Sequence, residues 1–371
     1  MSKTLQDYAT LINDTIQSNE INHYITTDNM CQNLGGIDTF KNINIPQGKV
    51  RSFQKDDILL SNIRLYFRKV YRAKQKGGCS SDVLVFRAKH IDSATLFAIL
   101  SSQIFTDYAC SGSQGSKMPR GNKTHMMDFK IPTINFTIAK IFNSIQNKIE
   151  NNHKINELLH KILELLYEQY FVRFDFLDEN NKPYQTSGGK MKFSKELNRL
   201  IPNDFEVKTL GELTQLKVGN KNANHSSNQG KYPFFTCSNN PLRCETYQFE
   251  GKHIIISGNG NFYVTHYDGK FDAYQRTYVV NPNNPNHYVL IYLFVKSYIN
   301  YLKLQSRGSI IKFITKSDIE NIKIVLPNLK TYAKWNNVLK MIENNNQATQ
   351  TLTALRDFLL PLLLKQQVKP Q

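Results

Sequence analysis

Short apolar runs and longer amphipathic stretches follow one another in the same order in each half of the chain. The runs at 57–61 and 253–257 predict buried strands, because apolar residues continue through both faces of the segment. The stretches at 93–110 and 287–304 predict helices. Each half therefore mixes strands with helices, and we expect an α/β (mixed α+β) fold.

The predicted elements belong to a long internal repeat with a nearly constant offset. The aligned pairs are 57–61 with 253–257, 83–85 with 278–280, 115–116 with 308–309, and 129–132 with 324–327. So many matches in one order indicate a duplicated structural unit. We therefore predict two similar globular domains.

A long amphipathic helix is expected after each copy, from Ile138 to Phe171 and from Val338 to Leu362. In the first, residues at coiled-coil spacing predict the buried stripe: Ile138, Phe142, Ile145, Ile149, Asn152, Ile155, Leu159, Ile162, Leu166 and Tyr170. Asn152 and Asn345 take matching places, where a polar residue either fixes the register of paired helices or marks a solvated crossing. Pro361 is expected to kink or end the second helix.

These elements predict four parts along the chain. Residues 1–133 and 203–329 are the globular domains, 134–202 the central long helix with its linker, and 330–371 the C-terminal long helix. The polar loop at 184–190 with its paired glycines lies between the halves.

Composition and charge narrow the function. The 371 residues are 40% hydrophobic and carry a net charge of +17, which excludes a disordered chain and favours a polyanionic partner, either nucleic acid or an anionic membrane surface. The longest apolar run stops at Lys296 after eight residues, too few to cross a membrane. With polar residues through 1–18 and five cysteines lacking a C-x-x-C pair, we expect a cytoplasmic protein.

Sequence signatures of catalysis are missing. The chain has no Walker A loop, no H-E-x-x-H and no Asn/Asp-Pro-Pro-aromatic tetrad, and Gly258-Asn259-Gly260 is better explained as a turn between two strands. Cys237 and Cys244 lack ligand-pair spacing with His225 or His253, so we expect no metal site. The chain is predicted to be non-catalytic.

Cations and amides gather where a nucleic acid is expected to bind. In the first half these candidates are Arg64, Tyr66, Arg68, Lys69, Arg72, Lys74 and Lys76, then Gln114, Ser116, Lys117, Arg120, Asn122 and Lys123. In the second half they are Asn239, Asn240, Arg243, Tyr263, Tyr274, Gln275, Arg276, Arg307, Ser309 and Lys312. A solvated surface with ordinary core aromatics is the alternative explanation.

Several short phrases, together with this architecture, resemble the DNA-specificity subunits of type I restriction-modification systems. The phrases are 24–30 with Gly35-Gly36, 171–176 leading to 182–184 and 187–191, and 232–236. The resemblance implies two target recognition domains that each read one half of a split double-stranded DNA site, and two long helices that pair as an antiparallel coiled coil. It also implies two modification (methyltransferase) subunits as partners, with or without restriction subunits.

By the same resemblance the chain needs no cofactor of its own, since AdoMet, ATP and Mg²⁺ belong to the partner subunits. Two other classes of function stay open at this point. One is a self-contained DNA-modifying or DNA-cleaving enzyme with an unrecognised active site. The other is a coiled-coil scaffold that does not bind DNA.

Overall fold

The chain forms two compact units, which we describe separately. The computed structural model describes residues 3–38, 41, 43–131, 133–178, 180–227, 229–238, 240–327, 332 and 334–364. The first unit joins residues 1–155 to 344–371, and the second comprises 156–343. Pro132, a landmark of the repeat, lies outside the described residues.

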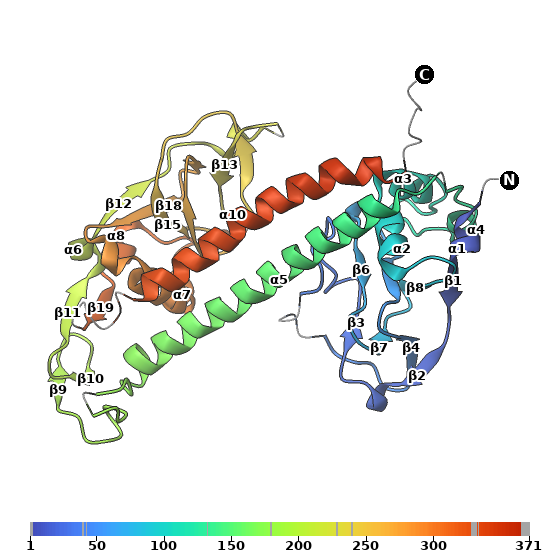
Figure 1. The fold of residues 1–371 in the computed structure, drawn as a ribbon. Coiled ribbons are helices and arrows are strands. Elements are labelled where there is room, and N and C mark those ends of the chain that lie inside the picture. Colours follow the sequence, from blue (N-terminus) through green and yellow to red (C-terminus); the bar gives the residue numbers. More distant parts are fainter. Residues whose placement is uncertain are drawn as a thin grey trace. The chain divides into compact units, whose positions relative to one another are not determined.

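A four-stranded antiparallel sheet forms the centre of the first unit (Figure 1). Its order is β1 (Ala9–Ile12), β8 (Val83–Ala88), β5 (Ile58–Ser61) and β6 (Val70–Arg72). A second sheet has the order β2 (Thr15–Gln17), β4 (Lys49–Phe53), β7 (Gly77–Cys79) and β3 (Tyr24–Ile25). The helices are α1 (Leu5–Tyr8), α2 (Ser93–Leu100), α3 (Gln103–Ser111) and α4 (Lys123–Met127). The predicted helix 93–110 is thus two helices, broken at Ser101-Ser102, where Ser102 caps α3.

Strand β5 is buried on both faces. Ile58 and Leu60 belong to the core formed with α2 and α3, whereas Leu59 lies in a second core with Ile25 and Phe53 of the other sheet. Because successive strand residues point to opposite faces, an unbroken apolar run is what a strand between two cores requires.

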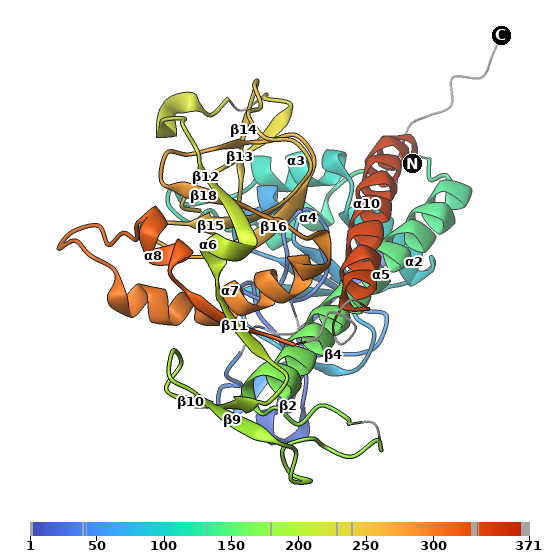
Figure 2. The same ribbon diagram turned by 90° about the vertical axis from the view of Figure 1, so that its left-hand side faces the viewer.

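The second unit repeats this plan (Figure 2). Its central sheet has the order β12 (Thr214–Val218), β18 (Thr277–Pro282), β15 (Lys252–Ser257) and β16 (Val264–Asp268). A second sheet contains β14 (Leu242–Cys244), β13 (Tyr232–Phe235) and β17 (Asp272–Ala273), and α7 (Tyr288–Gln305) covers the central sheet. Both central sheets are antiparallel with the same strand order, which confirms the two similar domains.

The two ends of each globular domain lie side by side. In the first unit the Leu5 amide donates to the Phe129 carbonyl at 2.9 Å. In the second, β11 (Glu206–Thr209) pairs with β19 (Lys323–Leu326), next to α6 (Leu210–Leu213) and α8 (Lys316–Glu320). A further hairpin, β9 (Met191–Ser194) with β10 (Arg199–Pro202), precedes β11.

The long helices are α5 (Phe136–Tyr167) and α10 (Trp335–Leu359). In the first unit Asn152 Nδ2 donates to Thr349 Oγ1 at 3.1 Å and Arg356 Nη1 donates to Gln146 Oε1 at 3.2 Å. The residue numbers rise along one helix as they fall along the other, so the pairing is antiparallel. Helix α10 ends two residues before Pro361, as expected.

The second unit contains the other halves of both helices, which also run antiparallel. Asn156 Nδ2 donates to the Ile342 carbonyl at 3.3 Å, and the rings of Tyr170 and Trp335 are 5.3 Å apart. The pairing predicted by the resemblance is therefore present in each unit.

The buried stripe of α5 departs from its predicted course after Asn152. Ile155 and Ile162 were expected in the stripe but are 41% and 46% exposed, whereas Asn156 and Leu163 are buried. The prediction is wrong there because it kept a strict three-and-four spacing, whereas the buried positions fall one residue later, at Asn156 and Leu163. The buried Asn156 amide donates to a backbone carbonyl.

No helix in the described part of the chain is long and apolar enough to cross a membrane. The expected division at 1–133, 134–202, 203–329 and 330–371 stays a prediction, since each compact unit combines a globular body with segments of both long helices.

Candidate nucleic-acid interface

Four loops meet at one edge of the first unit's central sheet, which we call the first loop edge. It comprises residues 26–29 after β3, 62–64 after β5, 80–82 before β8, and 112–122 after α3. Backbone hydrogen bonds join them: Ser80 N to Ile25 O, Asn62 N to Asp82 O, Gly121 N to Asn62 O, and Arg64 N to Pro119 O, at 2.7 to 3.1 Å. These hydrogen bonds hold the four loops together at the ends of the strands.

A short hairpin projects from this edge. Gln114 and Arg120 exchange two backbone hydrogen bonds at 2.9 and 2.8 Å, and Gly115 makes the turn with a φ of +97°. Gln114, Ser116 and Lys117 are exposed at its tip. Asn122 Oδ1 caps α4, and exposed Lys123 follows it.

The Arg64 end of the predicted cation cluster lies beside the hairpin. Tyr66 is 54% exposed there, and the Arg64 guanidinium is 6.0 Å from the Phe67 ring centroid. Lys69 Nζ donates to the Thr27 carbonyl at 2.5 Å, and Arg68 Nη2 donates to the Ser101 carbonyl at 2.9 Å. Burial lowers the pKa of both Arg68 and Lys69. Their hydrogen bonds to backbone carbonyls direct both side chains into the domain.

The other end of the cluster lies elsewhere, because β6 carries the chain to the opposite end of the sheet. Arg72 Nε is 3.7 Å from Asp56 Oδ1, and Lys74 Nζ is 3.2 Å from Glu150 Oε2 on α5. Lys76 is exposed in the turn before β7. The six cations therefore do not form a single surface, and DNA contact by any of them stays a prediction.

The second unit builds the matching second loop edge at the same strand ends. It comprises 236–240 after β13, 258–261 after β15, 274–276 before β18, and 306–314 after α7. Gly258 N donates to Arg276 O at 2.8 Å, and Gly260 N donates to Lys312 O at 3.1 Å. Its hairpin pairs Arg307 with Phe313, and Gly308 has a φ of +100°.

Most second-half candidates are exposed on this edge. Asn240, Gln275, Arg276, Ser309 and Lys312 are exposed, and the Arg276 guanidinium is 5.3 Å from the Phe313 ring centroid. Arg307 Nη2 is 3.1 Å from Asp318 Oδ1. Arg243 is exposed on β14, and Tyr274 is half-buried. Asn239 lies outside the described residues.

Tyr263 has an internal role. Its hydroxyl donates to the Thr236 carbonyl at 2.7 Å, and burial raises its pKa. It therefore supports the edge by joining two loops, and its hydroxyl is already engaged.

Sequence reasoning missed residues that the edges bring to the same surface. A shallow cavity of about 580 Å³ in the second edge is lined by Lys312, which was predicted, and by Gly260, Asn261, Phe262 and Lys303, which were not. The internal repeat could have located these loops, because Ser61 and Ser257 are aligned in it. Ser61 Oγ donates to Ile63 O and Ser257 Oγ donates to Asn259 O, each at 3.1 Å, so the two serines begin equivalent loops. Loops rich in exposed cations and amides are suited to contacting phosphates and base edges.

Part of the chain is similar to known DNA-specificity proteins. Residues 202–355 match the model of the type I restriction modification DNA specificity domain. The chain is 38% identical over 132 residues to the type I restriction enzyme EcoDI specificity subunit of Escherichia coli, a match covering 34% of this chain and 28% of that protein. It is 24% identical over 301 residues to the MjaIX specificity subunit of Methanocaldococcus jannaschii, covering 72% and 67%.

A solved structure has the same fold. The S subunit of a type I restriction-modification system from M. genitalium matches with a TM-score of 0.62 at 15% identity, over 99% of this chain and 96% of that one. The resemblance that the sequence phrases indicated is confirmed by these matches.

Proposed function

We propose that the chain is a type I restriction-modification specificity subunit: a non-catalytic, sequence-specific DNA-binding protein that reads a two-part asymmetric site. The observation that carries this proposal is the loop edge built twice on one backbone plan. Each edge presents exposed cations and amides on supported loops, which favours readout of base edges with phosphate contacts fixing the position.

The two edges differ in side chains, which favours two different half-sites. The first hairpin carries Ser116 and Lys117 where the second carries Ser309 and Ile310. Ile310 and Ile311 are 94% and 61% exposed. Apolar side chains contact the thymine methyl group in the major groove, whereas lysine prefers guanine or phosphate. Equivalent loops would therefore read unlike sequences.

We also propose that the chain assembles with two methyltransferase subunits, with or without restriction subunits, and positions them on DNA. AdoMet, ATP and Mg²⁺ would then bind in those partners. Exposed apolar residues on the second unit's part of α5 favour such docking: Leu158, Ile162 and Leu165 are 54%, 46% and 54% exposed. The five cysteines form no disulfide among the described residues, which suits the reducing cytoplasm.

Lys117 of the first loop edge and Lys123, which directly follows that edge, provide a direct test of DNA binding. We expect Lys117→Ala with Lys123→Ala to reduce the slope of log affinity against log salt by about 0.9 for each lost phosphate contact. The measurement is fluorescence anisotropy with a random-sequence DNA duplex at several salt concentrations. Affinity at low salt should fall as well.

The matched control removes the same charge from the opposite end of the sheet. Lys55 and Lys76 are exposed in turns away from the loop edge, so Lys55→Ala with Lys76→Ala should leave the slope unchanged. Equal slopes in all three proteins would show that the first loop edge faces away from DNA. A purified chain that modified or cleaved DNA by itself with Mg²⁺ and AdoMet would instead support the enzyme hypothesis.

A further inference from the structure

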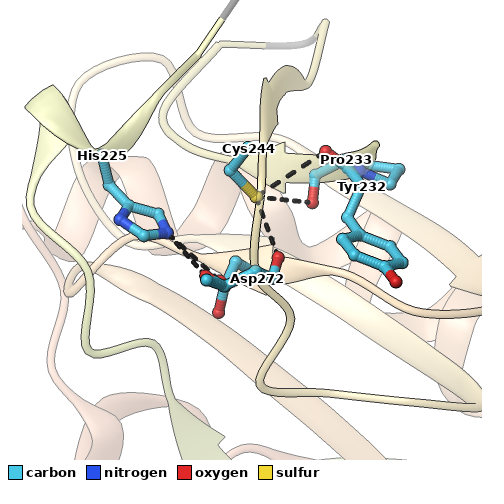
Figure 3. Close-up of polar contacts among 6 residues, drawn as sticks. His225, Tyr232, Pro233, Cys244 and Asp272 are labelled. Atoms are coloured by element: carbon cyan, nitrogen blue, oxygen red, sulfur yellow. Dashed lines mark hydrogen bonds and ion pairs between the residues drawn. The ribbon is translucent and has the colours of Figure 1, made fainter. Parts of the chain in front are cut away.

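Three side chains that could bind a metal ion lie close together at the second unit's smaller sheet. His225 comes from the 3-10 turn Ala223–His225, Cys244 ends β14, and Asp272 begins β17 (Figure 3). One ligand atom from each lies within 4.8 Å of the others. Strand β13 brings them together, since it pairs Tyr232 with Cys244 and Phe234 with Asp272.

The Asp272 carboxylate is incompletely satisfied. Its side chain is fully buried, and Oδ1 has no hydrogen-bond partner among the described residues. Oδ2 accepts from Thr246 Oγ1 at 2.6 Å and lies 3.3 Å from His225 Nε2. A buried carboxylate oxygen without a donor is strongly unfavourable, so a cation is the expected missing partner.

The Cys244 thiol is surrounded by backbone carbonyl oxygens. It is fully buried, with Sγ 3.2 Å from the Thr246 carbonyl oxygen and 3.7 and 3.9 Å from those of Tyr232 and Pro233. Without a metal ion the thiol proton can be donated to the Thr246 carbonyl oxygen. A metal ion would displace that proton and use the thiolate as a ligand.

We infer that His225 Nε2, Cys244 Sγ and the Asp272 carboxylate bind one Zn²⁺ ion, with water in the fourth position. Nitrogen, sulfur and carboxylate oxygen are the ligands Zn²⁺ takes, and tetrahedral ligands lie about 3.3 to 3.8 Å apart at usual bond lengths. The His225–Asp272 distance of 3.3 Å already fits. One thiolate and one carboxylate neutralise the ion, and the partly exposed His225 side chain leaves an entry path.

The site is a feature of the second unit alone. In the first unit, Gly78 pairs with Tyr24 where Asp272 pairs with Phe234, so the carboxylate ligand is missing there. A Cβ atom at Gly78 would lie 2.4 Å from Ile21 Cδ1, which leaves no room for a longer side chain. Zinc would therefore fix the 223–225 turn, β14 and β17, whose neighbouring loops form the second loop edge.

The test uses the full-length chain, freed of metal with a chelator and titrated with Zn²⁺ against a chromophoric competitor. We expect about one Zn²⁺ per chain, and Co²⁺ should give an ultraviolet thiolate-to-metal absorption band. Cys244→Ser and Asp272→Asn should each weaken binding at least about tenfold, and Cys244→Ser should abolish the band. Cys237→Ser, at an exposed cysteine outside the cluster, should bind as the parent does.

Cys244 and Asp272 are buried, so a loss of zinc binding in their variants has to be distinguished from misfolding. His225→Gln makes this distinction, because His225 is on a turn with its side chain partly exposed. It should keep the parent's circular dichroism and still lose zinc affinity. A parent chain that binds no zinc overturns the proposal, as does zinc binding unaffected in a folded His225→Gln variant or a band that survives in Cys244→Ser. None of these readouts depends on DNA.

Discussion

Exchanging residues 206–326 for the equivalent segment of a relative will change one half of the recognised DNA site and leave the other half unchanged. The segment begins and ends in a paired strand, because Glu206 of β11 lies opposite Leu326 of β19. Its central sheet, its smaller sheet and the whole second loop edge lie between those ends. The exchanged segment therefore contains the complete second loop edge and the two sheets that hold its loops.

The expected loss at the old half-site is large. Each mismatched base pair costs about 1–3 kcal/mol, so several mismatches reduce affinity for the old half-site by more than about a hundredfold. The measurement is a methylation map of DNA exposed to the assembled complex. The reciprocal exchange of residues 4–130, whose ends meet at the Leu5 to Phe129 hydrogen bond, serves as the control and should change only the other half-site. Altered specificity at both halves after either exchange would rule out independent reading.

The repeated fold could be predicted because its signals are local. The apolar runs that become β5 and β15 are buried on both faces, and glycines 115 and 308 each make a hairpin turn with positive φ. Such features depend on a few neighbouring residues, so the sequence displays them directly. The long helices were equally visible, because their three-and-four spacing continues for many turns.

The site was less predictable because its geometry depends on strand direction and on distant segments. A run of cations from Arg64 to Lys76 is continuous in sequence, yet β6 places its two ends at opposite ends of a sheet. His225, Cys244 and Asp272 lie in three separate segments: β13 pairs with the strands of Cys244 and Asp272, and the His225 ring contacts Phe234 of β13. Asn156 contacts α10 by donating a hydrogen bond to the Ile342 carbonyl, and a search for apolar residues does not detect such a contact.

One buried ion pair should dominate the stability of the first unit. Asp57 is 2% exposed, and its carboxylate accepts two hydrogen bonds of 2.8 Å from Arg87 and one of 2.8 Å from the Gln54 amide. These contacts join the start of β5 to β8. Arg87→Ala would leave the carboxylate buried without its counter-ion.

We expect Arg87→Ala to lower the free energy of unfolding of the first unit by about 3 kcal/mol, the low end for a broken buried pair, because the Arg87 side chain is itself 35% exposed. Hydrogen exchange of the β5 and β8 amides is the appropriate measurement, since the single tryptophan, Trp335, belongs to the second unit.

Arg120→Ala is the matched control, because the Arg120–Asp82 pair, at 2.9 Å, is nearly as short as the Arg87–Asp57 pair, at 2.8 Å, but has side chains 61% and 31% exposed. An exposed pair of this kind contributes about 0–1 kcal/mol. Adding Asp57→Asn to Arg87→Ala should recover part of the loss, since the buried charge is then removed while an acceptor for the Gln54 amide remains. If Arg87→Ala were no more damaging than Arg120→Ala, water would have to reach Asp57 readily, and its burial would not be the source of the pair's importance.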